Sequence, residues 1–536
     1  MSKPRTIFSI IFFFFFVFFI FKAGQTMFTV PFHDFDEAHR AEGARNMRLN
    51  SYYVSPLVGG PYNRPGPHSQ LSPETSRPPL IFNLMAIFSG LFGDYEWAYR
   101  LPSFIFGILG FACLFLFIRL FEKKYSWLAL SISLLSFLTA YDWWHSLQMA
   151  HLDTAVSLFT CLALFFLMLF IKNKKKLFLA FSGLALGLAI LSKGPPAVIF
   201  LFPLPYLLVA RKIKIKNLFL LFIIAFLTIL PWYIPLSLEH GFDYFFRKYI
   251  GGYVVSPSST KIGGGDPTQD APIFWYLRWW FDTFRPGIVL FGAFFLVDLI
   301  KKKLSWTKLT LLFYIVGGFG LFSYAKSKVW WYVLPVIPAV CAYLYFSIKD
   351  YLIENKTGVV NLSLVILLSS LPFFLFKTNT VSLAYGLSVT LLSFLILVFN
   401  WKNLKFVWNF GILEFWSFLL PVILVISFLS FYSHFPIITP THWETKYVGQ
   451  FFTSLPNTKC LWVEEDMPYE AILYYSQVRR TKYWNEDSQL TDDCVNYLVS
   501  DKKVNFGDLI YQNGPVRLYR MLTLKEKVDN IEINEK

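Results

Sequence analysis

A long series of apolar runs constrains the fold of this chain more than any other feature. Thirteen runs have a length that spans a membrane or comes close to it, at residues 6–22, 102–118, 127–141, 152–171, 177–191, 197–210, 217–236, 285–300, 309–325, 331–347, 359–376, 383–400 and 411–432. A helix needs about 20 apolar residues to cross the hydrocarbon core of a bilayer. Hydrophobic residues make up 55% of the 536 positions and charged residues 15%, which excludes an ordinary soluble protein. The sequence predicts an all-α polytopic membrane domain with about 13 transmembrane helices.

Basic residues gather in the short connections between these runs. If the N-terminus is cytoplasmic, six connections fall on the cytoplasmic side, at residues 119–126, 172–176, 211–216, 301–308, 349–357 and 401–405, and all six are basic. Because this is the positive-inside pattern, the net charge of +15 indicates topology. We expect membrane lipids as partners, and no nucleic acid. The predicted location is the plasma (inner) membrane, with multiple passes and a cytoplasmic N-terminus.

The first apolar run could be a signal peptide, because Lys3 and Arg5 precede it. The segment Lys22-Ala23-Gly24-Gln25 does not resemble a small-residue cleavage site. We therefore interpret this run as an uncleaved first span.

The alternation of sides leaves two long loops on the extracytoplasmic face, at residues 23–101 and 237–284, and loops of this length are usually functional or disordered. Within the first loop, Ala38, Ala41, Ala44 and Met47 recur at near-helical spacing, which predicts an amphipathic helix over Asp36–Asn50. On the polar side of this helix we expect Glu42, Arg45 and Arg48 to be solvated. A second short helix is expected over Ile81–Phe92 in the membrane interface.

The last hundred residues are polar and mixed in charge. Three β-like runs occur there, at Lys459–Val463, Val495–Val499 and Arg517–Met521, with a helical stretch at Tyr469–Gln477. We predict a membrane domain over residues 1–432 and a small extracytoplasmic α/β domain over residues 433–536. This domain contains Cys460 and Cys494, and the sequence leaves open whether they form a disulfide.

The segment His33–Arg40, directly after the first span, combines three carboxylates with two histidines. Acidic residues at a membrane boundary are costly, and for this reason they are candidates for function. The alternative is a solvated linker. The Asp34-Phe35-Asp36 sequence resembles the metal-binding D-x-D of soluble enzymes that use nucleotide sugars, but those substrates are cytoplasmic and this loop is expected outside.

Further polar motifs are expected on the same face. They contain the cations Arg77, Arg100, Lys193, Lys261 and Lys328 and the residues His145, His151 and Asp153. Cations near the interface can hold a lipid-linked phosphate, and a nearby carboxylate can act as a general base. Simpler alternatives remain: Lys193 can be a snorkelling lysine in a turn, and Asp153 an N-cap. Asp36, His145 and His151 are weak metal candidates, because six residues separate the two histidines. No cofactor is definite, and a divalent metal stays an open alternative.

The order of these motifs resembles a known family. The acidic pair after the first span is followed by Arg77-Pro78-Pro79, Tyr99-Arg100-Leu101-Pro102, Leu152-Asp153, Ser192-Lys193-Gly194-Pro195, and a segment from Lys328 to Pro338 containing Trp-Trp-Tyr. This order is similar to that of the bacterial aminoarabinose transferases of lipid A, and of the wider protein O-mannosyltransferase-like superfamily of GT-C membrane glycosyltransferases. The resemblance covers residues 1 to about 345, and beyond them extends only to the layout.

The resemblance implies an inverting transferase that uses a polyprenyl-phosphate sugar as its donor on the extracytoplasmic side. The acceptor would be lipid A, another glycan or a protein. The implied catalytic residues are Asp36, Glu37 and Asp153. Contacts to the donor phosphate would come from Arg77, Lys193 and Lys328, and we add Lys261 for its charge. Contacts to the acceptor, or support of the catalytic residues, would come from His39, Arg40, Arg100 and His151.

Three positions depart from the family pattern. His39 stands where arginine is usual, Arg40 where tyrosine is usual, and Ser76 where a glutamate linked to a bound metal is usual. The first two put the acceptor in doubt, and the third weakens the case for zinc. Two other functions share the expected features: a transporter or flippase for a lipid-linked sugar, and a polymerase or ligase for a preassembled oligosaccharide. A flippase would show broken spans in paired halves, and we find no internal repeat.

Overall fold

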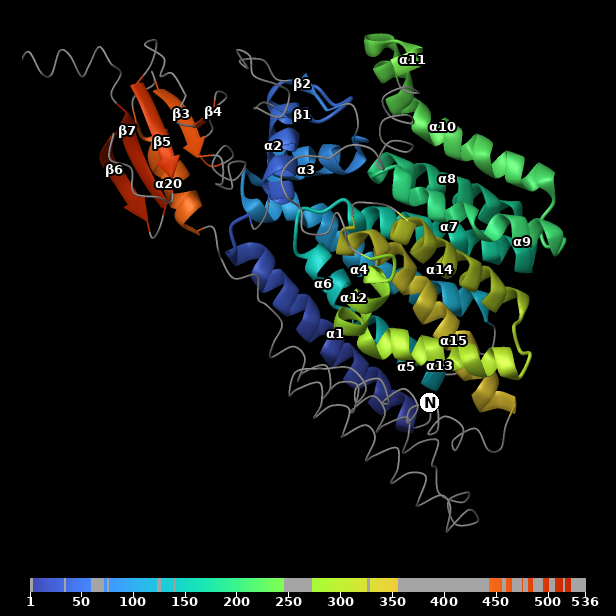
Figure 1. Ribbon diagram of the computed structural model, residues 1–536. Helices are drawn as coiled ribbons and strands as arrows, with labels where there is room; N and C mark the ends of the chain where they lie inside the picture. Colours follow the sequence, from blue (N-terminus) through green and yellow to red (C-terminus); the bar gives the residue numbers. More distant parts are fainter. Residues whose placement is uncertain are drawn as a thin grey trace, which may run out of the picture. The chain divides into compact units, whose positions relative to one another are not determined.

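The computed structural model (Figure 1) describes most of the first 354 residues and parts of the last hundred. The described residues are 3–32, 35–58, 72–74, 77–122, 127–138, 140–244, 272–324, 328–354, 443–455, 459–464, 475, 481–484, 495–500, 507–513 and 516–521. The predicted domain boundary at 432/433, the last three apolar runs and the helical stretch at 469–477, apart from the helical Tyr475, lie outside these residues.

The chain divides into two compact units, which we describe separately. Unit 1 comprises residues 1–24, 103–148 and 152–436, and unit 2 comprises residues 25–102, 149–151 and 437–536.

Unit 1 is a bundle of helices, and each of the first ten apolar runs coincides with a described helix or helix pair. Its elements are the first part of α1 (Lys3–Thr29), the rest of α4 (Glu96–Phe121), α5 (Trp127–Leu138), α6 (Tyr141–Leu147), α7 (Asp153–Asn173), α8 (Lys176–Ser192), η2 (Pro195–Leu201), α9 (Pro203–Val209), α10 (Ile215–His240), α11 (Phe242–Tyr244), α12 (Trp275–Thr283), α13 (Arg285–Ile300), α14 (Trp306–Tyr324), η4 (Trp330–Val336) and α15 (Ile337–Glu354). Five helices in the described part are long and apolar enough to cross a membrane: α4, α7, α10, α14 and the η4–α15 segment.

Burial distinguishes central from peripheral helices in this bundle. In the most apolar stretch of α7, 83% is buried, and in that of the η4–α15 segment 89%. In the corresponding stretch of α10 only 22% is buried. An apolar helix with so much exposed surface is suited to contact with lipid. The apolar face of α10 therefore favours a place at the edge of the bundle, and α7 and α15 form its centre.

Close contact between α8 and α10 depends on two glycines spaced four apart. A Cβ atom added to Gly183 would lie 2.6 Å from the carbonyl oxygen of Leu221, and one added to Gly187 would lie 2.8 Å from that of Ala225. Small residues at this spacing allow two helix backbones to approach closely, as in membrane helix pairs.

Unit 2 contains the helices α2 (Phe35–Leu49) and α3 (Leu80–Phe92), a short antiparallel pair of strands β1 (Leu57–Val58) and β2 (Ser72–Pro73), and the start of α4. The predicted amphipathic helix is confirmed as α2, and the short helix over Ile81–Phe92 as α3. The alanine face of α2 is fully buried, as expected. One expectation is wrong: Glu42 is 6% exposed and buried, not solvated.

The C-terminal part of unit 2 contains α20 (Trp443–Thr453) and a five-stranded sheet. The strands are β3 (Lys459–Glu464), β4 (Thr481–Trp484), β5 (Val495–Ser500), β6 (Gly507–Asn513) and β7 (Val516–Met521), in the order β4-β3-β5-β7-β6. β3 pairs in parallel with β4 and β5, and the remaining pairs are antiparallel. All three strands expected from the sequence are present. Phe451 and Phe452 of α20 pack on Tyr511 and Tyr497 of the sheet.

Candidate functional site

Helix α2 places two adjacent acids in different environments. Asp36 and Glu37 lie in its first turn, where the helix dipole favours negative charge. The side chain of Asp36 is 28% exposed, whereas that of Glu37 is 0% exposed. Neighbouring residues on a helix point about 100° apart, and here Glu37 points into the interior whereas Asp36 does not. Asp36 therefore keeps a carboxylate accessible to a ligand, and Glu37 does not.

Glu37 is held by a complete set of donors. The Arg100 guanidinium donates to both carboxylate oxygens, at 2.6 and 2.8 Å, and the backbone N–H of Ala150 donates to Oε1 at 2.9 Å. Arg100 also donates to the carbonyls of Met27, Val30 and Pro31. Arg100 is 1% exposed. This bidentate pair, buried and fully bonded, fixes the start of α2 to the segment that follows α1.

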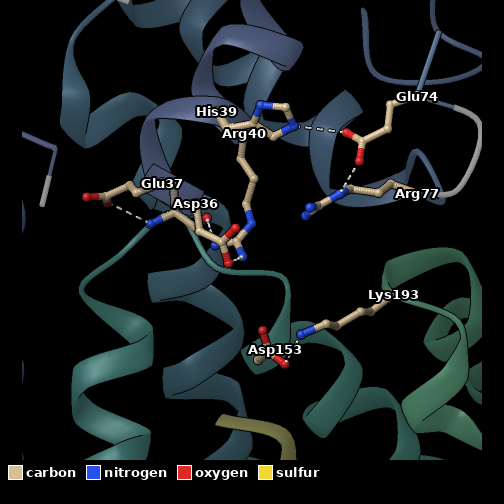
Figure 2. A network of polar contacts seen from close by, with 9 residues as sticks. Asp36, Glu37, His39, Arg40, Glu74, Arg77, Asp153 and Lys193 are labelled. Carbon is tan, nitrogen blue, oxygen red and sulfur yellow. Dashed lines mark hydrogen bonds and ion pairs between the residues drawn. The ribbon is translucent and has the colours of Figure 1, made fainter. Parts of the chain in front are cut away.

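Arg40 connects Asp36 to the same short segment. It donates from Nη2 to Asp36 Oδ2 at 2.5 Å, one helical turn away, and from Nη1 to the carbonyl of Ala150 at 3.2 Å. Figure 2 shows the Arg40 guanidinium against the Asp36 carboxylate. Ala150 thus holds both acids, through its N–H to Glu37 and through its C=O to Arg40. The orientation of Asp36 is set by groups that are themselves fixed.

Glu74 bridges His39 and Arg77, and sequence reasoning missed it. Its Oε2 lies 3.1 Å from His39 Nε2, and its Oε1 accepts from Arg77 Nε at 2.6 Å (Figure 2). Burial alone would raise the pKa of Glu74, but the Arg77 charge and the His39 hydrogen bond outweigh it and lower this pKa to about 2. The carboxylate is therefore ionised at neutral pH. The available signal was its position three residues before Arg77, near the place where the family pattern expects a glutamate and this chain has Ser76.

In unit 1 the structure brings together two further motifs that were singled out from the sequence. Asp153 at the start of α7 accepts from Lys193 Nζ at 2.5 Å (Figure 2). Gly194, with φ of 80°, makes the turn that follows Lys193. Asp153 is 1% exposed, and its Oδ2 has no hydrogen-bond partner in the described part of the chain. The N-cap of α7 is Leu152, so Asp153 does not have the capping role that was the simpler alternative.

The motif from Lys328 to Pro338 lies beside this pair. Lys193 Nζ is 4.7 Å from the centre of the Tyr332 ring, a cation–π contact. The Tyr276 hydroxyl donates to the carbonyl of Val329 and accepts from its N–H, at 3.1 and 3.2 Å. Lys328, the neighbour of Val329, is buried, with 5% exposure. Three sequence motifs thus converge in unit 1, at the starts of α7 and η4 and the end of α8.

Asp142 is a second buried acid that sequence reasoning missed. It accepts from Trp279 Nε1 at 3.0 and 3.2 Å and from Thr283 Oγ1 at 3.1 Å. Burial raises its pKa to about 7, although both donors act in the opposite direction. On the same short helix, the ring of His145 packs edge-on against Trp330, with 4.7 Å between ring centroids. An aromatic environment, with little competition from water, explains how a neutral carboxyl can persist here.

The remaining predicted residues are located as follows. His151 is fully buried in unit 2. Lys261 and Cys494 lie outside the described residues, as does Ser76. Within the described ranges, no three His, Cys, Asp or Glu side chains are grouped closely enough to hold a metal ion.

Known proteins resemble this chain in sequence and in fold. Residues 76–234 match the family model described as dolichyl-phosphate-mannose-protein mannosyltransferase. A protein of Aquifex aeolicus (strain VF5), described as uncharacterized, is 23% identical over 400 residues, which are 73% of each chain. The structure of ArnT from Cupriavidus metallidurans bound to undecaprenyl phosphate has a TM-score of 0.63 at 14% identity, and the apo structure 0.61 at 16%; each likeness covers 94% of this chain and 97% of that one. The expected GT-C fold is confirmed.

Proposed function

We propose that this chain, a membrane glycosyltransferase of the GT-C family, transfers a sugar from a polyprenyl-phosphate donor to a lipid A, glycan or protein acceptor on the extracytoplasmic face of the plasma (inner) membrane. The family match over residues 76–234 and the fold of ArnT support a transferase. The likeness to ArnT bound to undecaprenyl phosphate supports a lipid-phosphate donor. The topology expected from the sequence supports the side of the membrane, because the positive-inside rule assigns the basic connections and the acidic loop to opposite sides.

The observation that carries the proposal is the contrast between Asp36 and Glu37. Asp36 is accessible and held at 2.5 Å by Arg40, and Arg40 is itself bonded to a backbone carbonyl. A reacting carboxylate needs access to substrate together with a fixed direction. Asp36 has both, whereas Glu37 is enclosed by Arg100 and the Ala150 N–H. We assign the chemical role to Asp36, and to Glu37 the positioning of the helix that carries it.

Cations would neutralise the charge that develops on the leaving phosphate. In unit 2, Glu74 orients Arg77 through its Nε, and the side chain is 20% exposed, so the N–H edge of its guanidinium is the part that would bind a phosphate. In unit 1, Lys193 and Lys328 are the proposed cations, with Lys261 of the loop 237–284 as a further one. Preorganised charges of this kind contribute several kcal/mol to transition-state stabilisation.

The remaining predicted residues have supporting roles in this proposal. Asp153 holds Lys193 in place and keeps one oxygen for a substrate donor. His39 orients Glu74, and through it Arg77. The buried His151 supports the segment that bonds both acids.

The proposed step is a single displacement with inversion. The acceptor oxygen attacks the anomeric carbon, and the bond from this carbon to the phosphate oxygen breaks. Polyprenyl phosphate leaves with the electron pair. When the acceptor is a hydroxyl, its proton passes to Asp36, and when it is an anionic phosphate, Asp36 and Arg40 orient it and no proton is transferred.

The test is transfer from a radiolabelled polyprenyl-phosphate sugar to endogenous acceptors, in membranes that contain the wild type or Asp36→Asn. We expect the variant to lose about 10²- to 10⁴-fold in rate, because it lacks a general base. Asp94→Asn is the matched control: this carboxylate also pairs with an arginine, Arg48, but its side chain is 44% exposed. The control should retain activity.

Full activity in Asp36→Asn would contradict the mechanism. Movement of the labelled lipid across the membrane without transfer of its sugar would favour the flippase instead. Mass spectrometry of envelope lipids and glycans, with and without the protein, identifies sugar and acceptor.

A further inference from the structure

A cavity of about 460 Å³ lies at the end of unit 1 where five basic connections meet. Five segments line it: the last residues of α4 and of α7, Lys212 in the connection after α9, the start of α14 and the last turns of α15. These segments belong to the connections that the positive-inside pattern assigns to the cytoplasm. The cavity is therefore expected on the side opposite to the acidic loop, and the proposed transfer reaction does not use it.

The lining has an excess of positive charge. Lys172, Lys174, Lys212 and Lys349 line the cavity, against the acids Glu122 and Asp350. Glu122 is already shared, because Lys349 Nζ lies 2.7 Å and Lys172 Nζ 3.6 Å from its oxygens. Asp350 is engaged by the buried Lys308 at 2.8 Å. The two acids are thus committed to other lysines.

Lys174 and Lys212 have no carboxylate within ion-pair distance among the described residues. The ammonium of Lys212 lies 5.9 Å from the ring centre of Trp306, at the outer limit of a cation–π contact. Lys174 ends α7 with φ of 58°, a left-handed conformation that favours glycine or asparagine. The backbone at position 174 would favour one of these two residues, but the chain has a lysine there, and its charge lies at the cavity.

The start of α14 adds a second feature that favours an anion. Ser305, Trp306 and Thr307 line the cavity, and α14 begins at Trp306 and runs for 19 residues. The N-terminus of a helix carries partial positive charge and unpaired N–H groups, which bind phosphate readily. The positive-inside rule accounts for lysines in these connections, but it does not require a cavity with a helix N-terminus in its wall.

We propose that this cavity binds the phosphate-bearing headgroup of an anionic membrane lipid. The volume falls in the range of sites for small molecules. A lipid is favoured over a soluble phosphate because the cavity lies at the ends of α4, α7, α14 and α15, which are long enough to span the membrane, with Trp306 beside it. Tryptophan at a helix end marks the interface at headgroup level. Two lysines without acidic partners match a headgroup that carries one or two negative charges.

The experiment measures lipid binding to the purified full-length protein by native mass spectrometry, with phosphatidylglycerol and phosphatidylcholine compared in the same neutral detergent. The double variant Lys174→Gln/Lys212→Gln should weaken phosphatidylglycerol binding about 25-fold and leave phosphatidylcholine unchanged, because each lysine near a membrane surface contributes a factor of about five. The matched control is Lys175→Gln/Lys214→Gln. It removes the same charge from the same two connections, at exposed residues that do not line the cavity.

A third variant makes the test independent of folding defects. Glu122→Gln removes a negative charge from the lining and should strengthen phosphatidylglycerol binding, an outcome that misfolding cannot produce. Equal loss in both double variants would overturn the proposal, because it would reflect surface charge in general. Tight binding of inorganic phosphate without preference for phosphatidylglycerol over phosphatidylcholine would also overturn it, in favour of a soluble ligand.

Discussion

Two buried aspartate–lysine pairs in unit 1 differ in how completely they are bonded. Asp298 accepts from Lys308 Nζ at 2.9 Å, from the Tyr343 hydroxyl at 2.9 Å and from Ser347 Oγ at 2.6 Å. Both members of that pair are 0% exposed. Asp153 accepts from Lys193 at 2.5 Å, and its other oxygen has no hydrogen-bond partner in the described ranges.

In our proposal, this difference separates a structural pair from a functional one. Buried polar groups are nearly always hydrogen-bonded, and an exception calls for an explanation such as a ligand. The Asp298 network, with its hydroxyl donors and Lys308 shared with Asp350, leaves nothing for a ligand to complete. In the Asp153 pair, the lysine is 11% exposed and lies over Tyr332. The same two residue types thus hold helices together at one place and, in our proposal, a substrate at the other.

Between these two pairs, the largest expected effect is on the rate of sugar transfer, when the lysine of the Asp153 pair is removed. Lys193→Gln should lower the rate of sugar transfer by about 10²- to 10³-fold, because a charge aimed at the leaving phosphate is lost. Lys308→Gln should leave the rate per folded molecule near that of the wild type. Transfer assays normalised to folded protein check both. Equal losses in the two variants would remove the distinction.

The effect on the free energy of unfolding should be larger for the Asp298 pair than for the Asp153 pair, the opposite of the effect on the rate. Asp298→Asn should lower the free energy of unfolding by about 3 kcal/mol, because it leaves a buried lysine with only Asp350 as its partner. Asp153→Asn should cost about 1 kcal/mol, since Lys193 retains contact with solvent and with Tyr332. Denaturation of the purified variants in one detergent measures the difference. A larger loss for Asp153→Asn would contradict the assignment.

Glu74 of unit 2 is an intermediate case, and its effect depends on pH. Its folded-state pKa of about 2 lies below the ordinary value of 4.5. Its contribution to stability is therefore complete above pH 4.5 and is lost as the pH falls towards 2. Between pH 6 and pH 3 the wild type should lose about 1 to 2 kcal/mol more than Glu74→Gln, discounted for a side chain that is 21% exposed. Thermal denaturation of both proteins at a series of pH values measures this difference. An equal loss of stability in the two proteins between pH 6 and pH 3 would contradict the prediction.

The smallest effect is expected at the pair of Arg48 and Asp94, joined at 2.6 Å, because Asp94 is 44% exposed and an asparagine there keeps an oxygen that accepts from the Tyr99 hydroxyl. Asp94→Asn should change the free energy of unfolding by about 0.5 kcal/mol, because solvent screens such pairs. The same denaturation assay measures it, and 0.2 M added salt should reduce the effect further. A loss above about 2 kcal/mol would show that the exposure of these ion pairs does not determine how much each contributes to stability.

Local patterns in the sequence predicted the parts of the fold that depend on local physics. The spacing of the alanines predicted α2 and its buried face, and hydropathy predicted the helices that coincide with the first ten apolar runs. The motif order predicted that Asp153, Lys193 and the segment after Lys328 belong together. The sequence did not predict the burial of Glu42, and it gave no notice of Glu74, Asp142 or the Asp298 network. Asp142 and Asp298 depend on partners distant in the chain, such as Trp279 for Asp142 and Tyr343 for Asp298.

The sequence by itself determined the class of this protein, because the length and apolarity of its runs require helices across a bilayer, and the placement of its basic residues predicts their direction. It also determined which residues are candidates for the chemistry, through motif order. Only the tertiary structure decided between neighbours of the same type. It enclosed Glu37 with Arg100 while leaving Asp36 accessible, and it completed the bonds of Asp298 but not those of Asp153. Burial and hydrogen-bond partners decide what an acid can do, and both are properties of the folded chain.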